Sequence, residues 1–131
     1  MSIRVLLVED SPAMRSFVGS VLESAGEYHV DEVKDGFDAL RVMPRTDYDL
    51  VITDINMPDI NGLELIRAVR QQPRHVHTPL IVITTNDRAQ DVERALKLGA
   101  SAVLTKPFTP EALLDTVARL CKTARGPGGG G

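Results

Sequence analysis

Short apolar runs alternate with amphipathic helical patterns along this chain, and this alternation limits the possible folds more than any other feature. Strands that alternate with helices form parallel sheets with helices on both faces. We therefore predict an α/β fold with a doubly wound, five-stranded parallel sheet. The predicted strands are Ile3–Val8, Tyr28–Val33, Leu50–Thr53, Pro79–Thr84 and Ala102–Thr105. The mixed polarity of the second run indicates an edge strand.

The helices are predicted from apolar residues that recur at helical spacing between start and stop signals. The predicted helices cover residues 12–25, 37–43 and 62–71, a segment that ends at Gly99, and a segment that begins at Pro110. The side chains expected to face the core are Met14, Phe17, Val18, Val21, Leu22, Phe37, Ala39, Leu40, Met43, Leu63, Ile66, Val69, Val92, Ala95, Leu96, Leu113, Val117, Leu120 and Cys121.

Length and composition fit one domain, which we place at residues 1–124 of the 131. The formal net charge of −3 gives no basic surface for direct nucleic-acid binding. A single cysteine, Cys121, excludes a disulfide framework, and no apolar run is long enough to span a membrane. A cytoplasmic location is therefore expected. Residues 125–131 are rich in glycine and are expected to form a flexible tail or linker.

The stretch Leu50–Gly62 contains the first candidate for a functional residue. Its apolar run ends on Asp54 and is followed by turn-forming residues. A carboxylate at the end of a buried strand is costly unless it is paired, hydrated or bound to a metal. An acid that caps the next helix is the alternative interpretation for Asp54 taken alone.

Polar residues also follow the other buried strands. Glu9 and Asp10 follow the first strand, Thr84 ends the fourth, and Lys106 follows the fifth. Parallel strands bring their carboxyl ends to one edge of a sheet, where ligands bind. Three acids at one edge repel each other, and Mg²⁺ would relieve that repulsion. A phosphoryl group would then be held by Thr84 and Lys106, with Asp54 as the nucleophile.

These residues resemble those of the receiver domain of two-component response regulators, of the CheY-like kind. The resemblance covers Ile3–Thr123 and depends on four segments taken together. These segments are Val8–Asp10, Asp54–Gly62, Ile83–Thr84 and Lys106–Phe108. The resemblance, rather than the spacing, implies the strand order 2-1-3-4-5 of the flavodoxin-like and CheY-like folds.

The resemblance implies that Asp54 accepts a phosphoryl group from a phosphohistidine of a sensor histidine kinase. It implies Mg²⁺ as cofactor, bound by Glu9, Asp10, Asp54 and the backbone carbonyl of Asn56. Thr84 and Lys106 would act on the phosphoryl group, and the Lys106–Pro107 bond would be cis.

The resemblance also implies how the chain would be phosphorylated, how it would signal and which oligomeric state it would have. The chain would catalyse its own phosphorylation and dephosphorylation without being a conventional enzyme. It would signal to a downstream effector through the fourth helix, fifth strand and fifth helix. It would be a monomer or a phosphorylation-dependent dimer, with no membrane contact.

Two residues depart from the receiver pattern. An aromatic residue is common three positions before the lysine, where it acts as a rotameric switch, and Val103 occupies that position here. Thr85 stands where alanine is frequent and would narrow the space behind Thr84. The way in which phosphorylation changes the output surface is therefore open, while the acceptor chemistry is unaffected.

Three other functions fit the sequence less well. Phosphohydrolases of the haloacid-dehalogenase type use a similar set of residues, but they need an acid two positions after the nucleophile. Asn56 stands there, and an amide cannot protonate a leaving group. An interaction scaffold that is not phosphorylated is the second alternative, and Val103 is the single residue that favours it. A nucleotide or flavin site is disfavoured because no glycine-rich phosphate loop is present.

The remaining polar residues are expected to be structural or hydrated. His75 and His77 form a pair in a loop, where a solvated loop is favoured over a zinc site. His29 is expected at the surface, and Cys121 is expected to be an inert core thiol. The arginines expected on outer helix faces are Arg15, Arg41, Arg45, Arg67 and Arg70.

Overall fold

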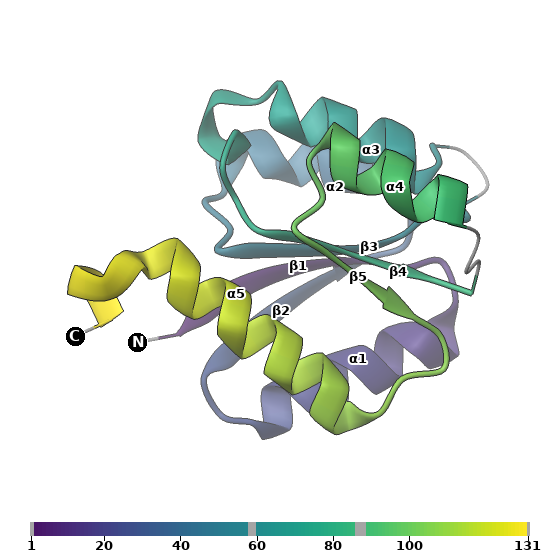
Figure 1. The fold of residues 1–131 in the computed structure, drawn as a ribbon. Coiled ribbons are helices and arrows are strands. Elements are labelled where there is room, and N and C mark those ends of the chain that lie inside the picture. Colours follow the sequence, from purple (N-terminus) through teal and green to yellow (C-terminus); the bar gives the residue numbers. More distant parts are fainter. Residues whose placement is uncertain (1, 58–59, 86–88, 131) are drawn as a thin grey trace.

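The computed structural model describes residues 2–57, 60–85 and 89–130, and it describes only the backbone of Ala89 and of residues 122–130. It contains one five-stranded parallel sheet with the order β2-β1-β3-β4-β5, which confirms the prediction (Figure 1). The strands are β1 (Ile3–Val8), β2 (Tyr28–Val33), β3 (Leu50–Asp54), β4 (Leu80–Thr84) and β5 (Ala102–Thr105). The polar strand β2 lies at an edge, as its composition predicted.

Helices cover both faces of this sheet (Figure 1). The helices α1 and α5 lie on one face, and α2, α3 and α4 lie on the other. Their bounds are α1 (Pro12–Ser24), α2 (Gly36–Val42), α3 (Gly62–Arg70), α4 (Ala89–Leu98) and α5 (Pro110–Gly130). Two short 3₁₀ helices, η1 (Met43–Arg45) and η2 (Pro73–His75), follow α2 and α3.

Two apolar cores result, because successive side chains of a strand point to opposite faces of the sheet. In β1, Val5 and Leu7 pack in the core under α1 and α5, and Leu6 and Val8 pack in the other core. All residues of β3 and β4 are buried. This double burial explains why the two strands are continuously apolar until the polar residues at their carboxyl ends.

Three side chains that were predicted to face the core are exposed. Phe17 is 37% exposed, Phe37 is 54% exposed and Leu96 is 47% exposed. Each lies one position from the buried stripe of its helix, which is a rotation of about 100°. This stripe includes Val18 in α1, Gly36 in α2 and Ala95 in α4. Hydrophobicity alone therefore misplaced these three residues.

The carboxyl-terminal helix is longer than the sequence analysis predicted. α5 continues to Gly130, whereas a flexible tail was expected from Arg125 onward. A helix can propagate past its last packed turn because each added residue forms one further hydrogen bond. Glycine nevertheless has a low helix propensity, so the flexibility of residues 125–131 and the domain boundary at residue 124 stay predictions.

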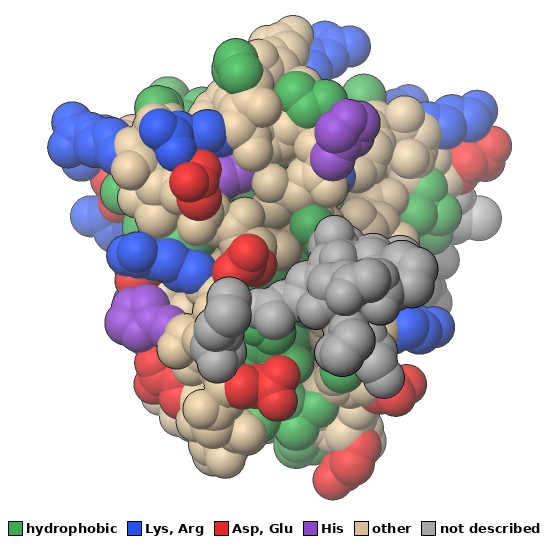
Figure 2. Space-filling model, turned by 90° about the vertical axis from the view of Figure 1, so that its left-hand side faces the viewer, with side chains coloured by type: hydrophobic (Ala, Val, Ile, Leu, Met, Phe, Trp, Pro, Cys, Tyr) green, Lys and Arg blue, Asp and Glu red, His purple; other side chains and the backbone are tan. Residues whose placement is uncertain are grey.

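His75 is buried, which corrects the expectation of a solvated His75–His77 loop. Its Nδ1 lies 3.0 Å from Thr78 Oγ1, and its Nε2 lies 3.1 Å from the carbonyl oxygens of Met43 and Thr46. His77 and His29 are exposed, as expected. Figure 2 shows the end of the molecule where the strands begin, and acidic and basic side chains are mixed over it.

Arg70 also departs from its expected position on an outer helix face. Its guanidinium donates to the carbonyl oxygens of Gly99, His75 and Thr78, at 2.7 Å for the shortest contact with Gly99. Burial lowers the pKa of this guanidinium. The side chain therefore joins the end of α3 to the loop that follows it and to Gly99, 29 residues further along the chain. Arg41, Arg45 and Arg67 are exposed, as predicted.

None of the helices, within the part of the chain that the structure describes, is both long enough and apolar enough to cross a lipid bilayer.

Candidate functional site

The sheet register brings the predicted site residues to one edge. Val8 pairs with Thr53, so Glu9 and Asp54, the next residues along β1 and β3, come level. Thr84 pairs with Thr105, which places Lys106 one residue beyond the end of β4. The backbone N–H of Lys106 donates to the carbonyl oxygen of Thr84 at 2.8 Å. The carboxyl ends of four strands therefore meet, as the sequence predicted.

Lys106 connects two of the acids. Its Nζ donates to Asp54 Oδ2 at 2.8 Å and to Glu9 Oε1 at 3.2 Å. The side chains of Lys106, Glu9 and Asp54 are 13%, 2% and 8% exposed, so these ion pairs lie inside the protein. The Lys106–Pro107 peptide bond is cis, as predicted.

Asp10 completes a cluster of three carboxylates. One carboxylate oxygen from each of Glu9, Asp10 and Asp54 lies within 4.8 Å of the others. Glu9 and Asp54 are buried, whereas Asp10 is exposed. The cluster is therefore reached from solvent on the side of Asp10. Three oxygens from a hard, anionic donor set fit Mg²⁺, which binds one or two carboxylates and keeps several waters.

Backbone N–H groups orient both buried carboxylates. Ser11 N–H donates to Glu9 Oε2 at 3.1 Å, and Asn56 N–H donates to Asp54 Oδ1 at 3.0 Å. Ser11 is also the N-cap of α1, because its Oγ accepts from the N–H of Met14. Each carboxylate is thus held by one N–H and by Lys106, and its position does not depend on a flexible side chain alone.

The charges in the site shift two pKa values. Burial raises the pKa of Glu9, and the charge of Asp54 adds to this, although Ser11 and Lys106 act in the opposite direction. Burial disfavours the charged form of Lys106, but its hydrogen bond and charge interaction with Asp54 and its contact with Glu9 outweigh this and raise its pKa. Lys106 therefore stays charged and partly neutralises the acids.

Arg15 takes part in this edge, although it was expected on an outer helix face. Its Nη1 donates to the carbonyl oxygen of Glu9 at 2.8 Å, and its Nε lies 3.9 Å from Glu32 Oε1. Its side chain is 24% exposed. This corrects the prediction and shows that Arg15 holds the backbone next to the acidic cluster. Nothing in the local sequence distinguished it from the solvated arginines.

Gly62 has a role that the sequence analysis did not identify. It begins α3, and a Cβ atom at this position would overlap the carbonyl oxygen of Asp54 and lie 2.7 Å from Cα of Ile55. Its N–H donates to the carbonyl oxygen of Ile55 at 2.8 Å. The start of α3 is therefore packed against the backbone that carries Asp54. The signal in the sequence was a glycine at a helix start.

Thr84 ends the strand next to β3, and Val103 lies three residues before Lys106 in β5. Thr84 is fully buried at the end of β4, and Val103 pairs with Val82 in the adjoining strand. Val103 is half-buried and packs against the core under α2, α3 and α4. Two segments near the site lie outside the described residues. They are Pro58 and Asp59, in the loop after β3, and residues 86–88, in the loop after β4.

These features define a class of protein when they are compared with known families. Residues 5–118 match the family described as the response regulator receiver domain, and the chain belongs to this family.

Several relatives of CheY type are similar over most of their length. A chemotaxis protein CheY homologue of Campylobacter jejuni is 35% identical over 126 residues, which cover 95% of this chain and 97% of that protein. CheY1 of Helicobacter pylori is 38% identical over 113 residues, which cover 86% of this chain and 91% of that protein.

Two solved structures support the same class. That of CheY4 of Vibrio cholerae has a TM-score of 0.87 and 37% identity, and it covers 92% of this chain and 99% of that one. The receiver domain of the sensor histidine kinase PA1611 of Pseudomonas aeruginosa has a TM-score of 0.85 and 32% identity, covering 92% and 98% of the two chains. Its structure is described with a magnesium ion in the active site cleft.

Proposed function

We propose that this receiver domain is a phosphorylation-controlled switch in a two-component phosphorelay, with Asp54 as the phosphoryl acceptor. The observation that carries this proposal is the contact of the Lys106 ammonium with both Asp54 and Glu9, within a cluster that also contains Asp10. A fixed cation beside a buried carboxylate suits the charge that develops on a phosphoryl group during transfer.

The transfer step needs no base, because a carboxylate is already ionised at neutral pH. A carboxylate oxygen of Asp54 attacks phosphorus, and the phosphorus–nitrogen bond of the donor phosphohistidine breaks. The electron pair of that bond stays on the imidazole nitrogen. The product is an acyl phosphate on Asp54, and water later attacks phosphorus to release phosphate. Lys106 and the hydroxyl of Thr84 hold the phosphoryl oxygens.

Glu9, Asp10, Asp54 and the backbone carbonyl of Asn56 would hold Mg²⁺. When bound, the ion supplies positive charge that offsets the three carboxylates and the incoming phosphoryl group. The donor set described above supports this assignment, as does the magnesium-bound receiver domain among the similar structures.

The partners in this proposal are a sensor histidine kinase and a downstream effector. An aromatic pair lies close to the site on the chain, because its half-buried member, Phe108, follows Lys106 by two residues. The ring of Phe17 on α1 lies 5.9 Å from that of Phe108, and Phe17 is 37% exposed. We propose that this pair contacts the kinase, and that the effector binds the surface of α4, β5 and α5.

The proposal extends to the location, the oligomeric state and the catalytic behaviour of the protein. It would work in the cytoplasm, as a monomer or as a dimer that forms on phosphorylation. It would not turn over a separate substrate, because Asn56 occupies the position where a phosphohydrolase of similar design needs an acid.

The experiment is phosphorylation by acetyl phosphate with Mg²⁺, followed by intact mass measurement. We expect one phosphoryl group on the wild type and none on Asp54→Asn. Asp47→Asn is the matched control, because this substitution makes the same chemical change in a side chain that is 80% exposed. Labelling that persists in Asp54→Asn, or that does not need Mg²⁺, would contradict the assignment.

A further inference from the structure

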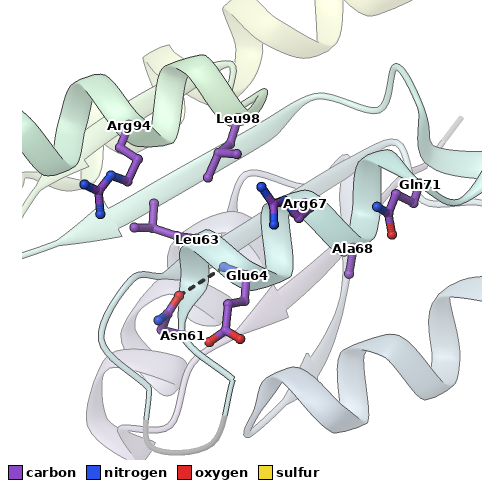
Figure 3. Close-up of a pocket in the computed structure, with 8 residues that line it drawn as sticks. All are labelled: Asn61, Leu63, Glu64, Arg67, Ala68, Gln71, Arg94 and Leu98. Atoms are coloured by element: carbon purple, nitrogen blue, oxygen red, sulfur yellow. Dashed lines mark hydrogen bonds between the residues drawn. The ribbon is translucent and has the colours of Figure 1, made fainter.

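A groove of about 450 Å³ lies between α3 and α4, and no residue of the acidic cluster lines it. Leu63, Arg67 and Ala68 of α3 line one side, and Arg94 and Leu98 of α4 line the other. Figure 3 shows the side chains of Leu63, Arg67, Arg94 and Leu98 directed into the space between the two helices. A space of this size can hold one or two side chains of another molecule.

The groove combines an apolar floor with basic rims. Leu63 and Leu98 are half-buried and pack against the core beneath them. Ala68, one turn along α3 from Glu64, has a side chain too small to fill the hollow. A ligand that inserts an apolar side chain of about the size of leucine into this hollow would therefore bury apolar surface.

Two guanidiniums at the groove are available to a ligand. Arg67 and Arg94 are exposed, and no carboxylate among the described residues forms an ion pair with either one. Arg41 and Arg74, by contrast, pair with Asp38 and Asp47. Glu64 also lines the groove, but its carboxylate points away from Arg67 (Figure 3). The groove is thus locally positive in a chain whose net charge is −3.

We propose that this groove is a docking site for an acidic peptide segment of a partner protein. Carboxylates of the segment would pair with Arg67 and Arg94, and an apolar side chain would insert between Leu63 and Leu98. Charge complementarity selects this occupant, because a basic segment would be repelled by both guanidiniums. The site shares α4 with the effector surface described above, but its other wall is α3.

The α3 wall of the groove begins next to the backbone of Asp54, and the α4 wall follows Thr84 in the chain. Gly62, the first residue of α3, makes the contact with that backbone. A movement of either segment on phosphorylation would change the spacing of the walls. This coupling rests on the proposed function, whereas binding of the peptide itself does not.

The test uses the full chain and a fluorescent helical peptide whose leucines lie on one face and are flanked by glutamates. A matched peptide carries lysine in place of each glutamate. We expect the glutamate peptide to bind and to shift amide resonances of α3 and α4 in NMR spectra. Arg67→Glu and Arg94→Glu should each weaken binding about tenfold, because attraction becomes repulsion. Arg45→Glu is the control, because it makes the same charge change at an exposed residue that does not line the groove.

Three results would overturn the proposal: no binding of the glutamate peptide, equal binding of the lysine peptide, or an Arg45→Glu effect as large as that of Arg94→Glu. A fourth variant, Ala68→Trp, fills the hollow without changing charge and should abolish binding. Unchanged binding in Asp54→Asn would support the groove independently of the phosphorylation site. Absence of binding together with normal labelling of Asp54 would refute the groove and leave the proposed function intact.

Discussion

At the scale of single residues, the ammonium group of Lys106 bridges two buried carboxylates. It contacts Glu9, which follows β1, and Asp54 at the end of β3, while its side chain is 13% exposed. Removing one partner of a buried ion pair leaves an uncompensated charge, which costs far more than the pair contributes by itself. The stability of the metal-free protein and the chemistry of the site therefore depend on the same side chain.

Gly62→Ala should destabilise the protein by about 2 kcal/mol, because the added Cβ overlaps backbone atoms that cannot move independently. Urea unfolding followed by circular dichroism measures this loss. Gly19→Ala is the control, because its Cβ would meet only the carboxylate end of Glu32, which can rotate away. Equal stability of the two variants would contradict the role assigned to Gly62.

The buried phenol of Tyr48 should make the stability of the protein depend on pH at high pH. Burial, together with its hydrogen bond to Asp31 Oδ2 at 2.9 Å, raises its pKa from 10.0 to about 12. The folded protein therefore holds this proton more tightly than the unfolded chain does. The resulting stability is present below pH 10 and is lost as pH rises from about 10 to about 12. Tyr48→Phe should show a smaller loss over this window in thermal melts, and an equal loss would refute the assignment.

At the scale of secondary-structure elements, the ends of helices are joined by polar contacts rather than by apolar packing alone. Arg70 links the last turn of α3 to the carbonyl oxygens of Gly99, His75 and Thr78. His75 in turn contacts the carbonyl oxygens of Met43 and Thr46 near η1. These contacts satisfy backbone oxygens at the end of the molecule where the strands begin.

Arg70→Met should lower the free energy of unfolding by about 2 to 4 kcal/mol, because several carbonyl oxygens lose a charged donor. Chemical denaturation measures the loss, and Arg67→Met, at an exposed position of the same helix, is the control with an expected change below about 0.5 kcal/mol. Labelling of Asp54 by acetyl phosphate should persist in both folded variants. A stability loss as large in Arg67→Met would show that the contacts of Arg70 are not its cause.

At the scale of the whole molecule, the acidic cluster should link stability to Mg²⁺. Three carboxylates meet at the edge of the sheet, and Lys106 contacts only two of them. A cation that binds the folded state alone raises stability in proportion to the logarithm of its concentration.

Lys106→Met should therefore destabilise the metal-free protein by about 3 kcal/mol, and Mg²⁺ should raise the melting temperature of this variant more than that of the wild type. Thermal melts with and without the ion measure both effects. Lys97→Met, which removes an exposed cation, should change neither. If Mg²⁺ stabilised Lys106→Met no more than the wild type, the cluster would not be the site of binding.

The local sequence was sufficient to predict the strands, most helices and the residues that gather at the carboxyl edge. Strand period, caps and polar residues at strand ends are local properties, and parallel pairing carries the residues at these ends to the same place. The positions of Glu9, Asp54 and Lys106 followed from this rule, whereas their roles in phosphorylation stay predictions.

Only the tertiary structure decided which polar side chains became buried. His75, Arg70 and Arg15 look like solvated residues in the sequence, yet each binds carbonyl oxygens from segments that are distant or that the helical pattern does not reveal. The groove between α3 and α4 is likewise made by two helices that are separated in the chain. A periodic pattern specifies which face of an element is apolar, but the partner of a polar group depends on how the elements pack.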